Sequence, residues 1–89
     1  KAAVHMMTKS LASDYADQNI RVNAIAPGYL ETDMSEALSE HQRSQIIRRT
    51  PLGRLGKSED VVPWIQFLLS PESAFATGQV ITVDGGASV

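Results

Sequence analysis

The feature that most constrains this chain is a pair of short segments that are largely apolar and rich in β-branched residues. They are Ile20–Ala26 and Gln79–Asp84. This pattern predicts strands that are buried on both faces, as in the parallel sheets of α/β proteins. Pro27 and Gly28 end the first segment, because proline lacks a donor for the ladder and glycine tolerates positive φ. Gly85-Gly86 closes the second.

A helix is expected before the first strand. Residues from Ala2 to about Tyr15 are alanine-rich. A stripe of large side chains recurs there every three or four positions, at Val4, Met7, Leu11 and Tyr15. A second face of this helix carries small or flexible side chains that suit packing on another helix, namely Ala3, Met6 and Ser10.

Two more helices are expected between the strands. The first would be capped by Thr32 or Asp33 and run through Met34 to Ile47, and the second would be capped by Ser58. The expected buried stripe of the second helix consists of Val61, Val62, Ile65, Leu68 and Leu69. A strand, a helix and another strand in this order imply a right-handed parallel crossover.

Composition excludes several classes of function. The net charge is −2, and no basic patch indicates nucleic acid. No apolar stretch is long enough to span a membrane. Cysteine is absent, which rules out disulfides and thiolate metal sites and fits a reducing compartment, so we expect a cytoplasmic protein. His5 and His41 lack the spacing of metal ligands, and no metal is expected.

The length raises a difficulty for an independent fold. Two parallel strands with two apolar faces cannot form a protected sheet without neighbouring strands and covering helices. The chain also begins with a lysine inside a helical pattern. We therefore expect the 89 residues to be a fragment of a larger domain.

Six landmarks follow one another along nearly the whole chain: Lys1–Val4, Asn19–Gly28, Glu31–Met34, Pro51–Gly56, Ser58–Val61 and Thr77–Gly86. This series closely resembles the C-terminal third of the short-chain dehydrogenase/reductases, and most of all the branch of 3-oxoacyl-carrier-protein reductases and sugar or polyol dehydrogenases. The resemblance implies the C-terminal portion of a Rossmann-type doubly wound parallel sheet. Residues 1–89 would then be the C-terminal part of a single NAD(P)-binding domain.

By this resemblance Lys1 is the lysine of the family's Tyr-x-x-x-Lys motif, with the acid/base tyrosine four positions earlier. An ammonium beside a tyrosine stabilises the phenolate and lowers its pKa, which proton exchange near neutral pH requires. The same ammonium could donate to the ribose hydroxyls of the cofactor. The alternative is a solvated lysine at the start of a helix.

The resemblance also places Pro27, Gly28 and the Leu30 main chain beside the nicotinamide of NAD or NADP. It gives Thr32 a hydrogen bond to the carboxamide or the phosphates, although a helix cap is an alternative role. Tyr29 and the helical excursion after it would form a wall and lid for the substrate. A surface helical hairpin is the alternative for this segment.

The implied activity is hydride transfer between a nicotinamide cofactor and a small-molecule carbonyl or alcohol substrate, of the 3-oxoacyl, sugar or polyol type. The two small or apolar faces of the first helix favour a homo-oligomer, and the resemblance implies a tetramer. Two alternatives are an inactive dinucleotide-binding regulator or scaffold and a truncated product without function. The residues that distinguish NAD from NADP would lie before Lys1.

Overall fold

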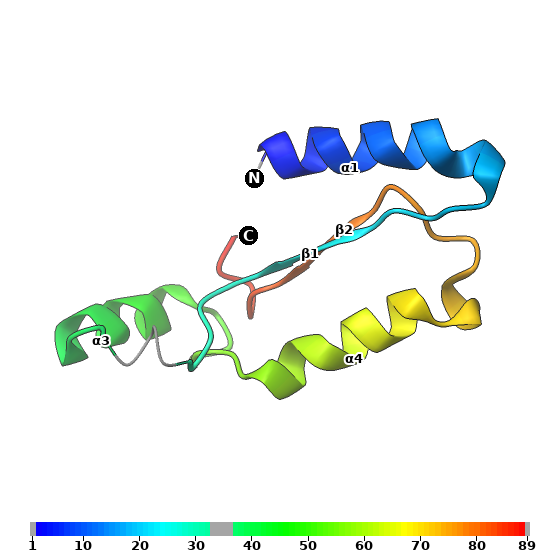
Figure 1. Ribbon diagram of the computed structural model, residues 1–89. Helices are drawn as coiled ribbons and strands as arrows, with labels where there is room; N and C mark the ends of the chain where they lie inside the picture. The colour runs from blue at the N-terminus through cyan, green and yellow to red at the C-terminus, as the bar shows by residue number, and fades with distance from the viewer. Residues whose placement is uncertain (1, 33–36, 89) are drawn as a thin grey trace. The chain divides into compact units, whose positions relative to one another are not determined.

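The computed structural model describes residues 2–32 and 37–88. Its elements alternate helices and strands in the expected order (Figure 1). They are α1 (Ala2–Tyr15), η1 (Ala16–Gln18), β1 (Ala24–Pro27), α3 (Glu40–Arg49), α4 (Ser58–Leu69), η2 (Pro71–Ser73) and β2 (Val80–Val83). The expected residues Asp33 and Met34 lie outside the described part of the chain.

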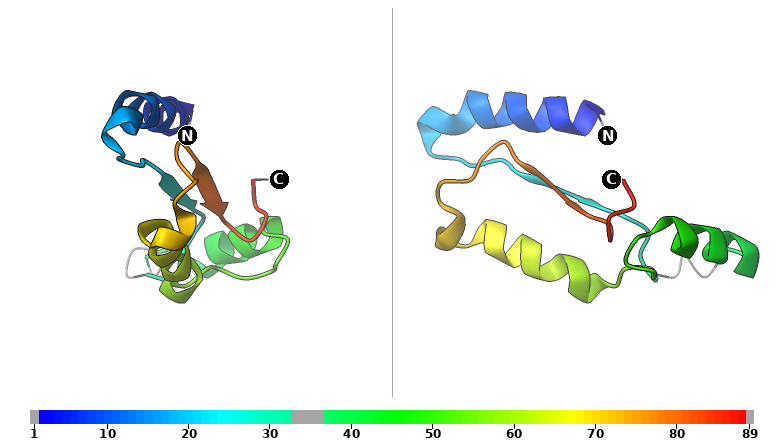
Figure 2. Two further views of the ribbon diagram at one scale, coloured as in Figure 1. Left: turned by 90° about the vertical axis from the view of Figure 1, so that its right-hand side faces the viewer. Right: turned by 180° about the vertical axis from the view of Figure 1, so that it is seen from behind.

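The two strands β1 and β2 are hydrogen-bonded neighbours, and both views of Figure 2 show them side by side. The residue numbers of the bonded pairs increase in the same direction along both strands. Ala24 N–H donates to Gln79 C=O at 2.9 Å, and Gly28 N–H donates to Val83 C=O at 3.0 Å. The pair is therefore parallel, as the apolar segments predicted.

The first strand is shorter than predicted, because the ladder begins at Ala24 rather than at Ile20. Side chains take the place of ladder bonds before that point. The Asn23 amide accepts from Gln79 N–H at 3.0 Å, and Thr77 Oγ1 accepts from Val22 N–H at 3.1 Å. A side chain that satisfies a main-chain group removes it from the regular ladder.

The chain divides into two compact units, each of which is described by itself. One unit contains the residues up to Ile25 and Pro63–Ile81. In it α1 is buried at Thr8 and Ala12, and Ala12 approaches Gly78, whose missing Cβ would lie 3.4 Å from the Ala12 Cβ. This contact uses Ala12, which is not part of the predicted face of Ala3, Met6 and Ser10.

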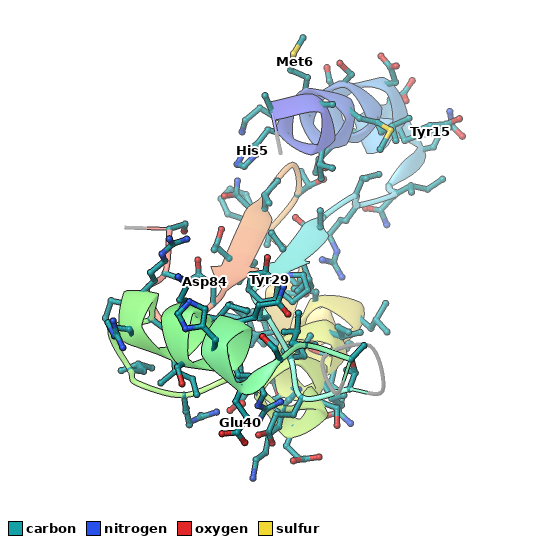
Figure 3. The ribbon with its side chains drawn as sticks, turned by 90° about the vertical axis from the view of Figure 1, so that its left-hand side faces the viewer. His5, Met6, Tyr15, Tyr29, Glu40 and Asp84 are labelled. Atoms are coloured by element: carbon teal, nitrogen blue, oxygen red, sulfur yellow. The ribbon has the colours of Figure 1, made fainter. Side chains whose placement is uncertain are left out.

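Most positions of the helical stripes are exposed in these 89 residues taken alone. In α1 the stripe residues Val4 and Met7 are exposed, and in α4 only Val61 is buried, while Leu69 is 80% exposed. Met6 points away from α1 (Figure 3). Hydrophobic periodicity identified the helices and their apolar faces. It could not show whether these 89 residues include the elements that pack against those faces.

The second unit contains Ala26–Val62 and the residues from Thr82 onward, with Leu55, Val61 and Thr50 buried. The helix that carries Ile46 and Ile47 begins at Glu40, and not at Thr32 or Asp33 as predicted.

Ser39 explains this start, because its hydroxyl accepts from Gln42 N–H at 3.1 Å and its N–H donates to the Gln42 side chain at 2.8 Å. These reciprocal bonds form a capping box.

Candidate functional site

The carboxyl ends of β1 and β2 form the candidate site, because ligands of open parallel sheets bind at this edge. Gly28 follows β1 directly, and the Cβ that it lacks would lie 2.8 Å from the Asp84 Cβ. A larger residue would push the strand ends apart. Gly28 therefore has a packing reason to be glycine, which is compatible with the cofactor role expected from the sequence.

Asp84 closes the turn after β2 (Figure 3). Its carboxylate accepts from Gly86 N–H and from Ser88 N–H, both at 3.0 Å. Gly85 and Gly86 have positive φ of 64° and 90°, a conformation that glycine adopts without strain. Sequence reasoning identified this turn but missed that one carboxylate holds it.

The chain beyond β1 is held in an extended form by a parallel bridge between Leu30 and Gly56. Glu31 N–H donates to Gly56 C=O at 2.7 Å, and Gly56 N–H donates to Tyr29 C=O at 2.9 Å. In a parallel bridge of this kind the central residue uses neither its own N–H nor its own C=O. Both groups of Leu30 therefore face the opposite edge of the segment.

The predicted site residues at the end of β1 and after it lie near one another because they are almost consecutive in the sequence. Pro27 is the last residue of β1, Tyr29 is 64% exposed, and Thr32 is exposed two residues beyond Leu30. Lys1 lies outside the residues that the structure describes.

Glu31 joins this segment to α3 through an ion pair that the sequence did not predict. The Arg43 guanidinium donates to the Glu31 carboxylate at 3.2 Å, and the side chains are 31% and 46% exposed respectively. Such an exposed pair contributes only about 0.2–1 kcal/mol.

Asp60 is a second residue whose role was missed. Arg54 donates two hydrogen bonds to its carboxylate, at 2.8 and 3.0 Å, and Lys57 N–H donates a third at 2.7 Å. The Arg54 hydrogen bonds, and then the Lys57 amide, lower the pKa of Asp60 to about 2. The carboxylate is therefore ionised at neutral pH.

This geometry corrects the predicted cap of α4. Ser58 Oγ donates to the Glu59 carboxylate at 2.9 Å, whereas the side chain that accepts a main-chain N–H at the helix start is Asp60. Lys57 occupies the cap position, directly before α4, and Asp60 follows it by three residues. An acidic residue at this spacing is half of a capping box, so the signal was present in the sequence.

The main chain at this edge can complement a carboxamide. Leu30 presents one donor and one acceptor on the same edge of the segment, and a carboxamide carries one acceptor oxygen and a donor NH₂. Gly28 leaves the approach free of a Cβ. The chain's residues therefore fit the nicotinamide end of a dinucleotide.

Other kinds of site find no support in the part of the chain that the structure describes. Residues 2–32 and 37–88 contain no group of three or more acidic, histidine or cysteine side chains that could hold a metal ion. Among the same residues no helix has the length and apolar character needed to cross a membrane.

Comparison with known proteins gives consistent matches. The family described as enoyl-(acyl carrier protein) reductase matches residues 1–88. A 3-oxoacyl-[acyl-carrier-protein] reductase of Thermotoga maritima is 55% identical over 86 residues, which is 97% of this chain and 35% of that protein. The chain thus spans about a third of the length of the curated relatives it matches.

Two solved structures share the fold. The 3-oxoacyl-[acyl-carrier protein] reductase of Brucella melitensis superposes with a TM-score of 0.91 at 38% identity, covering 96% of this chain and 32% of that one. A protein of Agrobacterium tumefaciens assigned as a 2-deoxy-D-gluconate 3-dehydrogenase, with bound NADP, gives a TM-score of 0.90 at 42% identity, covering 96% and 35%.

These structures confirm the expected α/β class, a portion of a Rossmann-type parallel sheet. The chain belongs to the short-chain dehydrogenase/reductase family.

Proposed function

We propose that this chain is the C-terminal part of an NAD(P)-dependent oxidoreductase, in a single dinucleotide-binding domain. Hydride moves between the nicotinamide ring and the carbon of a carbonyl or alcohol substrate. The cofactor supplies the hydride chemistry, and the chain's own residues bind and orient its nicotinamide end.

The observation that carries this proposal is the free edge of Leu30. The bridge to Gly56 engages the neighbours of Leu30 and leaves its own N–H and C=O directed away from the loop. These two groups are placed to bind a carboxamide beyond the carboxyl end of β1. The exposed Thr32 hydroxyl adds a hydrogen bond to the carboxamide or the phosphates.

Lys1 supports proton transfer in this proposal. Its ammonium stabilises the phenolate of a tyrosine four residues earlier, in the family's Tyr-x-x-x-Lys arrangement, and donates to the cofactor ribose. The tyrosine then exchanges a proton with the substrate oxygen as hydride reaches the substrate carbon.

The substrate belongs to the 3-oxoacyl, sugar or polyol class. Relatives named as 3-oxoacyl-[acyl-carrier-protein] reductases and a neighbour assigned as a sugar-acid dehydrogenase support this range. Tyr29, being largely exposed beside the proposed nicotinamide position, forms one wall of the substrate pocket. The segment that leads to α3 supplies the lid.

The test is a substrate panel on the full-length protein. Oxidation of NADPH and NADH is followed by absorbance with a 3-oxoacyl thioester, a keto sugar acid and a ketose. Turnover of at least one member is expected. Tight dinucleotide binding without turnover of any member would contradict an enzyme and favour a regulator that binds the cofactor.

We further propose a homotetramer, in which α1 contributes to an interface. Met6 is 71% exposed on α1, and a methionine of this exposure gains from burial against another copy. Met6→Glu should split the full-length oligomer, because the interface would have to bury a charge. Sedimentation checks this, with Asp14→Glu as the matched control on the same helix. A monomeric wild type would contradict the proposal.

A further inference from the structure

The loop 54–60 contacts the segment that the proposed function places beside the cofactor. The contact is the parallel bridge between Leu30 and Gly56, with main-chain hydrogen bonds of 2.7 Å from Glu31 and 2.9 Å to Tyr29. Both bonds converge on Gly56. The position of the Leu30 main chain therefore depends on where the loop holds Gly56.

Any side chain at Gly56 would displace the end of the Leu30 side chain. A Cβ at this position would lie 2.8 Å from the Leu30 Cδ2 atom. Gly56 is absent from the glycines of positive φ, which are Gly53, Gly78, Gly85 and Gly86, so its backbone conformation alone would accept another residue. The absence of a side chain at Gly56 therefore matters for the contact with Leu30, whereas the backbone conformation of the loop does not require a glycine here.

The Asp60 carboxylate closes the loop around Gly56. Arg54 donates to both carboxylate oxygens, at 2.8 and 3.0 Å, and also to the Leu55 carbonyl at 3.0 Å. On the other side of Gly56, Lys57 N–H donates to Asp60 Oδ2 at 2.7 Å. One side chain therefore holds the residues before and after the glycine.

This arrangement exceeds what capping α4 requires. A cap needs only the bond from the Lys57 amide, which one oxygen supplies. The forked contact with Arg54 fixes the plane of the Asp60 carboxylate and draws in the part of the loop that precedes Gly56. The bonds between Arg54 and Asp60 therefore hold the residues around Gly56 in place, and the bridge from Gly56 in turn holds Leu30.

We propose that Asp60 and Gly56 are positioning residues for the nicotinamide end of the cofactor, acting through the Leu30 main chain. Asp60 holds the loop, Gly56 carries the bridge, and the bridge orients the free N–H and C=O of Leu30. Neither residue touches the cofactor. This inference rests on the proposed function, which names the ligand of the Leu30 edge.

A first experiment needs no cofactor. In the full-length protein, Asp60→Ala should speed amide exchange of Glu31 and Gly56, whose N–H groups make the bridge. Glu59→Gln is the matched control, because it removes an acidic charge from the same first turn of α4, where Glu59 accepts from Ser58 Oγ and not from Arg54 or Lys57. Unchanged exchange at Glu31 in Asp60→Ala would overturn the inference.

A second experiment separates the two halves of the dinucleotide. Binding of NADPH or NADH, whichever the wild type prefers, is compared by calorimetry with binding of the matching ADP-ribose, which lacks the nicotinamide. Asp60→Ala and Gly56→Ala should each weaken dinucleotide binding by about fivefold, the effect of roughly one hydrogen bond, and leave ADP-ribose binding unchanged. Equal weakening of both ligands would overturn the inference, because it would indicate a general loosening.

Asp60→Asn provides an intermediate variant. It keeps an acceptor for the Lys57 amide but loses the charged fork with Arg54, so its dinucleotide affinity should fall between wild type and Asp60→Ala. A dinucleotide affinity equal to that of the wild type would overturn the positioning role of the Arg54–Asp60 ion pair, and Asp60 would act only as the cap of α4. Failure of the wild type itself to bind any dinucleotide would instead refute the proposed function.

Discussion

The two ends of the strand pair are completed by different chemistry. Before β1, side chains supply several of the bonds to the main chain, beside one main-chain bond from Gly78 N–H to Val22 C=O at 2.7 Å. The Arg21 guanidinium donates to the carbonyls of Leu68 and Ala76 at 3.0 and 3.2 Å. Asn23 donates to Ala76 and accepts from the Gln79 amide, both at 3.0 Å.

After β1, hydrogen bonds between main-chain groups, several of them at glycines, hold the segment around Leu30. Gly28 bonds to Val83, and Gly56 bonds to the residues on either side of Leu30. Side chains here are exposed, among them Tyr29 and Thr32. This end presents the main-chain edge of Leu30 to a ligand.

The difference shows how one short sheet separates stability from binding. A charged side chain that bonds several carbonyls holds connecting segments in place, which stabilises the fold. An end built from glycines and main-chain bonds allows a ligand to approach closely. Changes at the first end should therefore alter stability, and changes at the second should alter binding.

The largest effect is expected for Lys1, which the proposal assigns both to proton transfer and to the cofactor ribose. Lys1→Met in the full-length enzyme should lower kcat/KM by at least about a hundredfold, or roughly 2.7 kcal/mol of transition-state stabilisation. Steady-state kinetics check this, with Lys57→Met as the control for loss of a lysine. A variant with more than half of wild-type activity would remove Lys1 from the mechanism.

The next effect concerns the stability end. Arg21→Met keeps an apolar stem but loses the bonds to the carbonyls, so the free energy of unfolding should fall by about 2 kcal/mol. Urea denaturation of the full-length protein measures it. Arg48→Met, on the exposed face of α3, should be nearly neutral. A loss of cofactor affinity in Arg21→Met without a loss of stability would reverse the comparison.

At the binding end, Thr32→Ala should raise the cofactor Kd by about fivefold, the value of one hydrogen bond near 1 kcal/mol. Calorimetric titration tests this, and Ser44→Ala in exposed α3 is the control. If only thermal stability falls and affinity is unchanged, Thr32 acts as a cap and not as a ligand.

The smallest effect is a pH dependence at Asp60. Its pKa is lowered from 3.8 to about 2 in the folded state, so the carboxylate contributes stability above pH 4 that is lost as the pH falls through 2. The melting temperatures of wild type and Asp60→Asn should therefore differ at pH 7 and converge near pH 2. A difference that persists undiminished at pH 2 would show that the ionised carboxylate is not its source.

Local patterns predicted most of the elements and part of the site. The alanine-rich stripe gave a helix with the bounds of α1, Ala2–Tyr15. Pro27-Gly28 correctly marked the end of the first strand, which led to the candidate site beyond it. Each of these signals lies within a few residues along the chain, where periodicity and turn chemistry act.

Other features of the site could not be read from a local pattern. The close contact of Gly56 with Leu30, which is distant in sequence, is one such feature. The Glu31–Arg43 ion pair likewise joins a loop to a helix whose start was misplaced.

The sequence by itself determined the helical and strand segments, the turns that end them and the family, because these depend on residue type and short spacing. Tertiary structure alone decided where β1 begins and how Leu30 is presented. The physical reason is competition for main-chain hydrogen bonds. Asn23 and Thr77 replace ladder bonds before β1, and Gly56 occupies one edge of the Leu30 segment, leaving the other edge for a ligand.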